Sequence, residues 1–228
     1  MTTLRIDPVH CGPVGSGNGG WTAGLLARHV DAAAVTVTLR RPPPLGRDLV
    51  VRDEVDRAVL LDGDRLVAEA EPASEPDAVP PVDADEAAAA EPAYPGLTDH
   101  PFPHCFVCGT VPAEGVGLRL RPGPTAPGRT ACTWTPHPAH TRAAHLWAAL
   151  DCPGGWTDDI AGRPMVLGRI TAAVHRSPQA GEPLVVVGER RETVGRKTMT
   201  ATSVYDRGGR IVGSAAHTWI RVDPRTFA

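Results

Sequence analysis

Hydrophobic and polar positions alternate with a period of two along much of this chain, which is typical of half-buried β-strands. Val35, Val37 and Leu39, for example, alternate with Thr36 and Thr38. In the first part of the chain the pattern predicts strands over 34–41, 48–57 and 58–70. In the second part it predicts strands over 117–121, 130–134, 165–177, 182–193, 195–206 and 210–222. Asp-Gly at 62–63 is a strong hairpin signal.

Two stretches are predicted to be helical. Over 21–30, Leu25, Leu26 and Val30 fall on one face at helical spacing, and Asn18 can cap the start. A second helical stretch is expected around 140–160. Each half of the chain then consists of one helix followed by an antiparallel run of strands. Two such units side by side could form one continuous sheet that hides their edge strands, so the predicted fold class is α+β.

A repeated tetrapeptide divides the chain. Gly-Gly-Trp-Thr occurs at 19–22 and again at 154–157, and a leucine (Leu49, Leu184) follows each tryptophan at a distance of 28 residues. This self-similarity indicates a tandem duplication. We therefore divide the chain into a first half over residues 1–70, a linker over 71–103 and a second half over 104–228.

The linker differs from the rest of the chain in composition. It is rich in proline and alanine and holds eight acidic residues and no lysine or arginine. We expect it to be extended or disordered, with one helical turn around 85–90 and little to bury. Since the whole chain has 23 basic and 26 acidic residues, the part outside the linker carries about five net positive charges. That balance suits an anionic ligand, although the charges are scattered.

Composition also excludes several classes of protein. No apolar run approaches the roughly 20 residues that span a bilayer, and the N-terminus does not resemble a signal peptide. We therefore expect a cytoplasmic protein that does not bind a membrane. No basic run with interleaved aromatic residues indicates nucleic-acid binding. The five cysteines, in a chain without an export signal, argue against a disulfide framework.

Three segments carry a resemblance to a known family. They are His-Cys-Phe-Val-Cys-Gly at 104–109 with Gly-Leu-Arg-Leu at 117–120, Leu-Asp-Cys-Pro-Gly-Gly-Trp at 150–156, and Val-Gly-Arg-Lys at 194–197 with the hairpin at 204–210. Together with the Gly-Gly before a central helix, they resemble the PaaI-like acyl-CoA thioesterases of the hotdog fold. Outside the linker, the resemblance covers nearly the whole chain.

The resemblance implies a double hotdog in one chain that hydrolyses an acyl-CoA or acyl-carrier thioester by water attack, in a tunnel between the halves. It implies no cofactor beyond the coenzyme A of the substrate, and a homodimer of double-hotdog chains stays open. The chain departs from the family pattern because Asn18 and Pro153, rather than histidine, precede the two Gly-Gly pairs. Ala27 and Gly162 stand where an acidic residue is usual. A non-catalytic acyl-ligand binding protein and a hotdog dehydratase are therefore the alternatives.

Thioester hydrolysis needs a polarised carbonyl and an activated water. Unpaired amides at a helix N-terminus can supply the first, so Gly20, Gly154 and Gly155 are candidates for an oxyanion site, with a tight turn as the alternative. Asp151 is the candidate general base and Asn18 a candidate ligand of the water or carbonyl. For each of these two the alternative is a capping role. If only one of the two sites is active, we expect it to be the second Gly-Gly copy. Asp158 or Asp159 is the second choice of base, with exposed helix charge as the alternative.

Further polar residues have weaker assignments. Arg169, Arg196 and Lys197 are the candidate partners of coenzyme A phosphates, with generic surface charge as the alternative. The segment Cys105-Phe-Val-Cys108 has zinc-knuckle spacing, which His104 or His100 could help to complete, and His10-Cys11 only through a tertiary contact. Because no second Cys-x-x-Cys exists, we favour buried thiols that pack a loop and expect no metal. His137, His140 and His145 are interpreted as exposed loop histidines.

Overall fold

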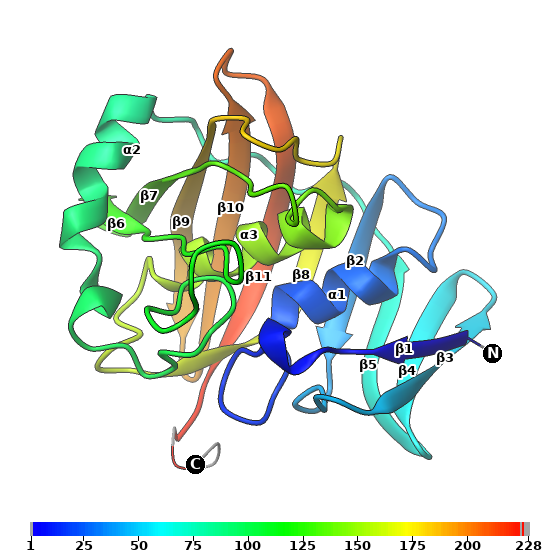
Figure 1. Ribbon diagram of the computed structural model, residues 1–228. Helices are drawn as coiled ribbons and strands as arrows, with labels where there is room; N and C mark the ends of the chain where they lie inside the picture. The colour runs from blue at the N-terminus through cyan, green and yellow to red at the C-terminus, as the bar shows by residue number, and fades with distance from the viewer. Residues whose placement is uncertain (1, 224, 226–228) are drawn as a thin grey trace.

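β-Strands of both halves join in a single antiparallel sheet of eleven strands in the computed structural model, which describes residues 2–223 and 225. The strand order is β1-β3-β4-β5-β2-β8-β11-β10-β9-β7-β6, so each half of the chain forms one side of the sheet (Figure 1). The strands are β1 (Thr2–Arg5), β2 (Ala34–Leu39), β3 (Asp48–Glu54), β4 (Arg57–Asp62), β5 (Arg65–Pro72), β6 (Gly123–Ala126), β7 (Arg129–Trp134), β8 (Met165–Val174), β9 (Leu184–Val194), β10 (Lys197–Asp206) and β11 (Ile211–Arg221).

The two longest helices lie side by side on one face of this sheet (Figure 1). Helix α1 spans Gly19–Ala27 and helix α3 spans Ala143–Gly155. A large apolar cluster from both halves packs around them, including Trp21, Leu26 and Leu150. Each half is thus a sheet wrapped around one helix, and the chain has the architecture of a double hotdog, as the sequence predicted.

The halves meet where β2 pairs with β8. Their register runs from Ala34 opposite Ala173 to Thr38 opposite Arg169. The hydroxyl oxygens of Thr36 and Thr171 lie 2.6 Å apart across the junction. This pairing removes one edge strand from each half, because the ladder continues from one into the other.

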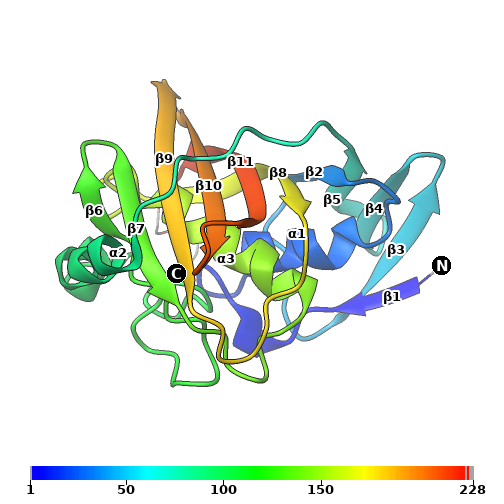
Figure 2. The ribbon, with the colours of Figure 1, turned by 90° about the horizontal axis from the view of Figure 1, so that it is seen from above.

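The first part of the acidic segment, directly after β5, lies on the opposite face of the sheet from α1 and α3 (Figure 2). It crosses that face without regular structure and then forms α2 (Ala84–Ala90) and two 3-10 turns, Glu91–Ala93 and Pro95–Leu97. Val79 and Ala87 are fully buried there, and the amide of Val79 donates to Ser203 Oγ over 2.9 Å. The helical turn was predicted, but the prediction that the segment has little to bury is wrong.

Most predicted strands and both predicted helices are present, with shifted ends. The strand predicted over 117–121 is wrong. Leu118 and Leu120 are buried, but Arg119 between them has φ 56°, and a left-handed residue interrupts a strand. The amides of the two leucines donate instead to the carbonyls of Phe106 and Val107. Strands β1 and β6 were not predicted.

The two copies of Gly-Gly-Trp-Thr occupy opposite ends of helices. Gly19 and Gly20 begin α1, whereas Gly154 and Gly155 end α3. Each of the two similar folding units therefore contains one copy of the repeat, but the two copies are not structurally equivalent. No described helix has the length and apolar character required to cross a membrane.

Candidate functional site

A buried carboxylate of the second half meets the first turn of the helix of the first half. Asp151, in α3, is 1% exposed, and its Oδ2 accepts hydrogen bonds from the amide of Gly20 (2.9 Å) and from Asn18 Nδ2 (3.1 Å). Asn18 caps α1, because its Oδ1 accepts from the amide of Trp21 over 2.8 Å. The structure thus brings together Asn18, Gly20 and Asp151, three of the residues that the sequence singled out, from segments more than 130 residues apart.

This contact depends on small residues in both helices. A Cβ atom on Gly20 would lie 2.6 Å from Asp151 Cβ and 2.6 Å from the carbonyl oxygen of Trp147. One turn later, a Cβ on Gly24 would lie 2.9 Å from Ala144 Cα. Glycine at both positions lets the two helices approach closely enough for the carboxylate to reach the amide.

The carboxyl group of Asp151 has a raised pKa, and only one of its two oxygens accepts hydrogen bonds. Burial raises its pKa to about 7, although the hydrogen bonds from Gly20 and Asn18 favour the charged form. Oδ1 of the same group has no hydrogen-bond partner among the described residues. A carboxyl group with a free oxygen and a pKa near neutrality is suited to take up and return a proton.

A cavity of about 290 Å³ adjoins this carboxylate. Asn18, Gly19 and Asp151 form part of its wall, and the rest is largely apolar, with Phe102, Leu167 and other hydrophobic residues from both halves. The amide of Gly19 has no acceptor among the described residues. An unpaired first-turn amide on the wall of an apolar cavity is a ready hydrogen-bond donor for a carbonyl or oxyanion.

The assignment of Gly154 and Gly155 to an oxyanion site is wrong in its structural premise. Both lie at the C-terminal end of α3, where carbonyl groups rather than amides lack helical partners. The Thr157 hydroxyl donates to the carbonyl of Gly154 over 2.6 Å, and the Thr130 hydroxyl donates to the carbonyl of Pro153 over 2.8 Å. The second copy of the tetrapeptide is therefore built to end a helix.

Asp158 and Asp159 are not part of the cavity wall. Asp158 lies beyond α3 and contacts the guanidinium groups of Arg163 (3.2 Å) and Arg190 (3.4 Å). Burial opposes its ionisation, but the amide of Asp159, the hydroxyl of Thr198 and these two guanidinium groups hold its pKa below the usual value. An ionised, paired carboxylate of this kind has a structural role.

The three basic residues assigned to coenzyme A phosphates are exposed and lie off the cavity wall. Arg169 Nε donates to Thr38 Oγ1 over 3.0 Å, and Arg196 and Lys197 lie at the tip of the β9–β10 hairpin. The wall instead contains Arg40 and Arg41, which follow β2. Sequence reasoning missed both, because only the folded chain shows that the end of β2 reaches the cavity.

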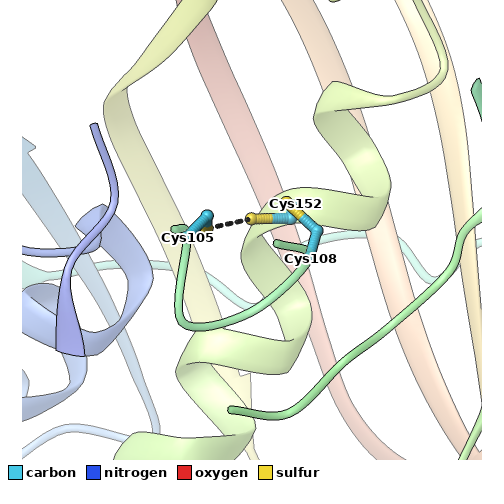
Figure 3. Close-up of side chains that lie close together, drawn as sticks. All are labelled: Cys105, Cys108 and Cys152. Atoms are coloured by element: carbon cyan, nitrogen blue, oxygen red, sulfur yellow. Dashed lines mark hydrogen bonds between the residues drawn. The ribbon is translucent and has the colours of Figure 1, made fainter. Parts of the chain in front are cut away.

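Three cysteines form a buried cluster on another part of the cavity wall (Figure 3). Cys105 and Cys108 come from the loop before β6 and Cys152 from α3. The sulfur atoms of Cys105 and Cys152 are 3.8 Å apart, and His100 Nε2 is 3.4 Å from Cys108 Sγ. The prediction of buried thiols holds for Cys105 and Cys108, whereas Cys152 was not foreseen as their partner.

The prediction of exposed loop histidines is confirmed for His137 but is wrong for His140 and for His145, which lies in α3. His137 is exposed, but His140 and His145 are each 4% exposed. His10 stacks on Trp21 with 3.8 Å between ring centroids, and the ring of His145 lies 4.8 Å from the same tryptophan. Burial lowers the pKa of His145 to about 3, so these rings pack as neutral aromatic groups.

Solved structures with the same architecture exist, although no protein-family model and no curated protein matches the sequence. A conserved protein of unknown function with a hotdog fold from Alicyclobacillus acidocaldarius aligns with a TM-score of 0.65 at 14% identity, over 97% of this chain and 93% of the other. The TesB protein of Mycobacterium avium subspecies paratuberculosis aligns with a TM-score of 0.57 at 13% identity, over 97% and 92%.

A third structure, the acyl-CoA thioesterase II TesB2 of Mycobacterium marinum, aligns with a TM-score of 0.51 at 13% identity, over 86% of this chain and 82% of the other. At these identities the likeness concerns the fold. It confirms the hotdog architecture that the sequence indicated, over nearly the whole chain rather than over one half.

Proposed function

We propose that this chain is a thioester hydrolase that acts on an acyl group carried by coenzyme A or by an acyl-carrier protein. The observation that carries the proposal is the contact of the Asp151 carboxylate with the first turn of α1, through the Gly20 amide, on the wall of an apolar cavity. Two of the structural neighbours named above are TesB proteins, one of them named as an acyl-CoA thioesterase, which supports the same reaction class.

In the proposed reaction the acyl chain lies in the cavity and its thioester carbonyl oxygen faces the free amide of Gly19. Asp151 Oδ1 accepts a proton from a water molecule, and the water oxygen attacks the carbonyl carbon. Negative charge then develops on the carbonyl oxygen, where the Gly19 amide and the positive end of α1 stabilise it. When the C–S bond breaks, the protonated Asp151 returns its proton to the leaving thiolate.

Asn18 and Gly20 have positioning roles in this scheme. Both donate to Oδ2 of Asp151, which leaves Oδ1 for the water. The sequence-based assignment of Gly20 to the oxyanion is thereby changed, since its amide is already occupied. Gly19, which precedes it, takes that role.

A binding protein without activity is the second candidate, and one observation favours it. Asp151 is the ninth residue of α3, and the ninth residue of α1 is Ala27. The helix of the first half therefore lacks a carboxylate at the position that corresponds to Asp151. If each half had a site of this kind, only the one with Asp151 would have a carboxylate base at this position. A dehydratase has less support, because within the described residues no histidine pairs with Asp151.

A panel of acyl-CoAs of increasing chain length separates these candidates. We expect release of free thiol from at least one chain length, together with binding measured by calorimetry. Binding without release of thiol from any acyl-CoA or acyl-carrier substrate would reject the hydrolase and favour the binding protein.

A further inference from the structure

The three clustered cysteines have no role in the proposed reaction, yet their arrangement is that of metal ligands. The sulfur atoms of Cys105, Cys108 and Cys152 all lie within 4.8 Å of one another, and all three cysteines are free and buried (Figure 3). Thiolates bound to one tetrahedral zinc ion at about 2.3 Å lie about 3.8 Å apart. The observed distance of 3.8 Å between Cys105 and Cys152 matches this spacing.

The loop that carries two of these cysteines is shaped like a metal-binding knuckle. The amide of Gly109 donates to the carbonyl of Cys105 over 2.9 Å and closes a tight turn around the two cysteines. A Cβ on Gly109 would lie only 2.4 Å from that carbonyl oxygen, so the turn requires glycine. A tight turn of this kind holds Cys105 and Cys108 close together, with the Cys-x-x-Cys spacing that zinc sites use.

His100 completes the surroundings of the cluster. Its Nδ1 accepts from the amide of Phe102 over 3.0 Å, which places the ring proton on Nε2, 3.4 Å from Cys108 Sγ. His100 is therefore arranged as a hydrogen-bond donor to the Cys108 sulfur. His100 and the three cysteines all line the cavity, so a metal held by the three sulfurs would lie at the cavity wall.

We propose that Cys105, Cys108 and Cys152 bind one zinc ion as thiolates, with the fourth coordination position open to the cavity. Zinc is a metal that thiolate ligands commonly bind in a tetrahedral arrangement. Binding releases the thiol protons and ties the loop over 104–109 to α3, one residue from Asp151. The proposal contradicts our sequence-based expectation of no metal, which was made without knowing that Cys152 joins the pair. It does not depend on hydrolytic activity.

Metal content of the full-length chain tests this directly. We expect one equivalent of zinc per chain after purification under reducing conditions with zinc supplied. Replacement by cobalt should give the near-ultraviolet charge-transfer absorption of thiolate-bound cobalt. Cys152→Ser should lose the metal, whereas Cys132→Ser, which changes a buried free cysteine in β7 outside the cluster, should keep it.

A measurement on the wild-type chain covers the case in which Cys152→Ser does not fold. Titration with an organomercurial thiol reagent should release the bound zinc as the cysteines react. A reduced wild-type chain that binds neither zinc nor cobalt would overturn the proposal, as would zinc that stays bound after every thiol has reacted. A folded Cys152→Ser chain with the metal content of the wild type would do the same.

Discussion

At the scale of single residues, burial decides which protonation state a side chain keeps, and it acts in opposite directions on acids and bases. It raises the pKa of Asp151 to about 7 and lowers that of His217, in β11, to about 4. Both groups are thereby biased toward their neutral forms. The shifted pKa of Asp151 affects proton transfer in the proposed reaction, whereas that of His217 affects the stability of the fold at low pH.

His217 should make the fold sensitive to acid. Since its folded pKa of about 4 lies below its ordinary value of 6.5, the unfolded chain takes up the proton first. The contribution of His217 to the free energy of unfolding is therefore fully present above pH 6.5. It is lost as the pH falls toward 4, and the loss amounts to about 3 kcal/mol. Denaturant unfolding of His217→Gln should show a smaller loss between these pH values than the wild type. An equal loss in both would contradict the assignment.

Arg41 should contact the phosphates of a coenzyme A substrate, because it lines the cavity and has no ion-pair partner among the described residues. Arg41→Ala should raise KM for an acyl-CoA by about threefold to tenfold, as is reasonable for an exposed charge. It should leave the KM of an acyl-pantetheine, which lacks the nucleotide, unchanged. Arg196→Ala is the matched control. A larger effect of Arg196→Ala would favour the sequence-based assignment instead.

At the scale of elements, the site exists because α1 and α3 touch through small residues. Gly20 faces Trp147, Ala148 and Asp151, and Gly24 faces Ala144 and Trp147. The spacing of four residues in each helix keeps these positions on one face. Glycine is unfavourable inside a helix relative to alanine, so its presence here reflects packing.

Gly20→Ala should therefore destabilise the chain in spite of the better helix propensity of alanine. Its Cβ would lie 2.6 Å from backbone and side-chain atoms of α3, and overpacking of this kind costs about 1–3 kcal/mol. Denaturant unfolding would measure the loss. Gly208→Ala, in the β10–β11 turn, has only Asp206 Oδ1 at 3.2 Å and Arg210 Nε at 3.9 Å near the new atom and should change stability little. A similar change in the free energy of unfolding for both variants would contradict the packing argument.

Local pattern was enough to predict most strands and both long helices, and it singled out Asn18, Gly20 and Asp151, which the structure brings into contact. The local pattern gave a wrong prediction where the same residues are compatible with two different local structures. Gly-Gly can begin a helix or, after Pro153, end one, where the Thr130 and Thr157 hydroxyls donate to the last helical carbonyls. It also failed for contacts between distant segments, because no spacing in the chain links Cys152 to the Cys105 loop.

At the scale of the whole molecule, the two halves share one sheet and one core. The β2–β8 junction joins the strands, and the α1–α3 contact joins the helices that those strands surround. The acidic segment adds a further connection, since it leaves the first half and packs on the second, where the Tyr205 hydroxyl contacts the carbonyl of Val79. The architecture is duplicated, but Ala27 stands in α1 at the position that Asp151 has in α3.

These shared contacts should make the chain unfold as one unit. Calorimetry should give a single transition whose van't Hoff and calorimetric enthalpies agree, as in small two-state domains. The physical reason is that neither half can keep its helix buried without the other. Two resolved transitions, one for each half, would show that the junction contributes little to stability.

The most direct test of the proposed site is the activity of Asp151→Asn, which keeps the shape of the side chain and removes its charge. We predict that kcat for a hydrolysed acyl-CoA falls by about 10²- to 10⁴-fold, the range for loss of a general base, while acyl-CoA binding stays close to that of the wild type. Asp159→Asn, an exposed acid outside the cavity wall, should keep full activity. An Asp151→Asn chain with the turnover of the wild type would contradict the account.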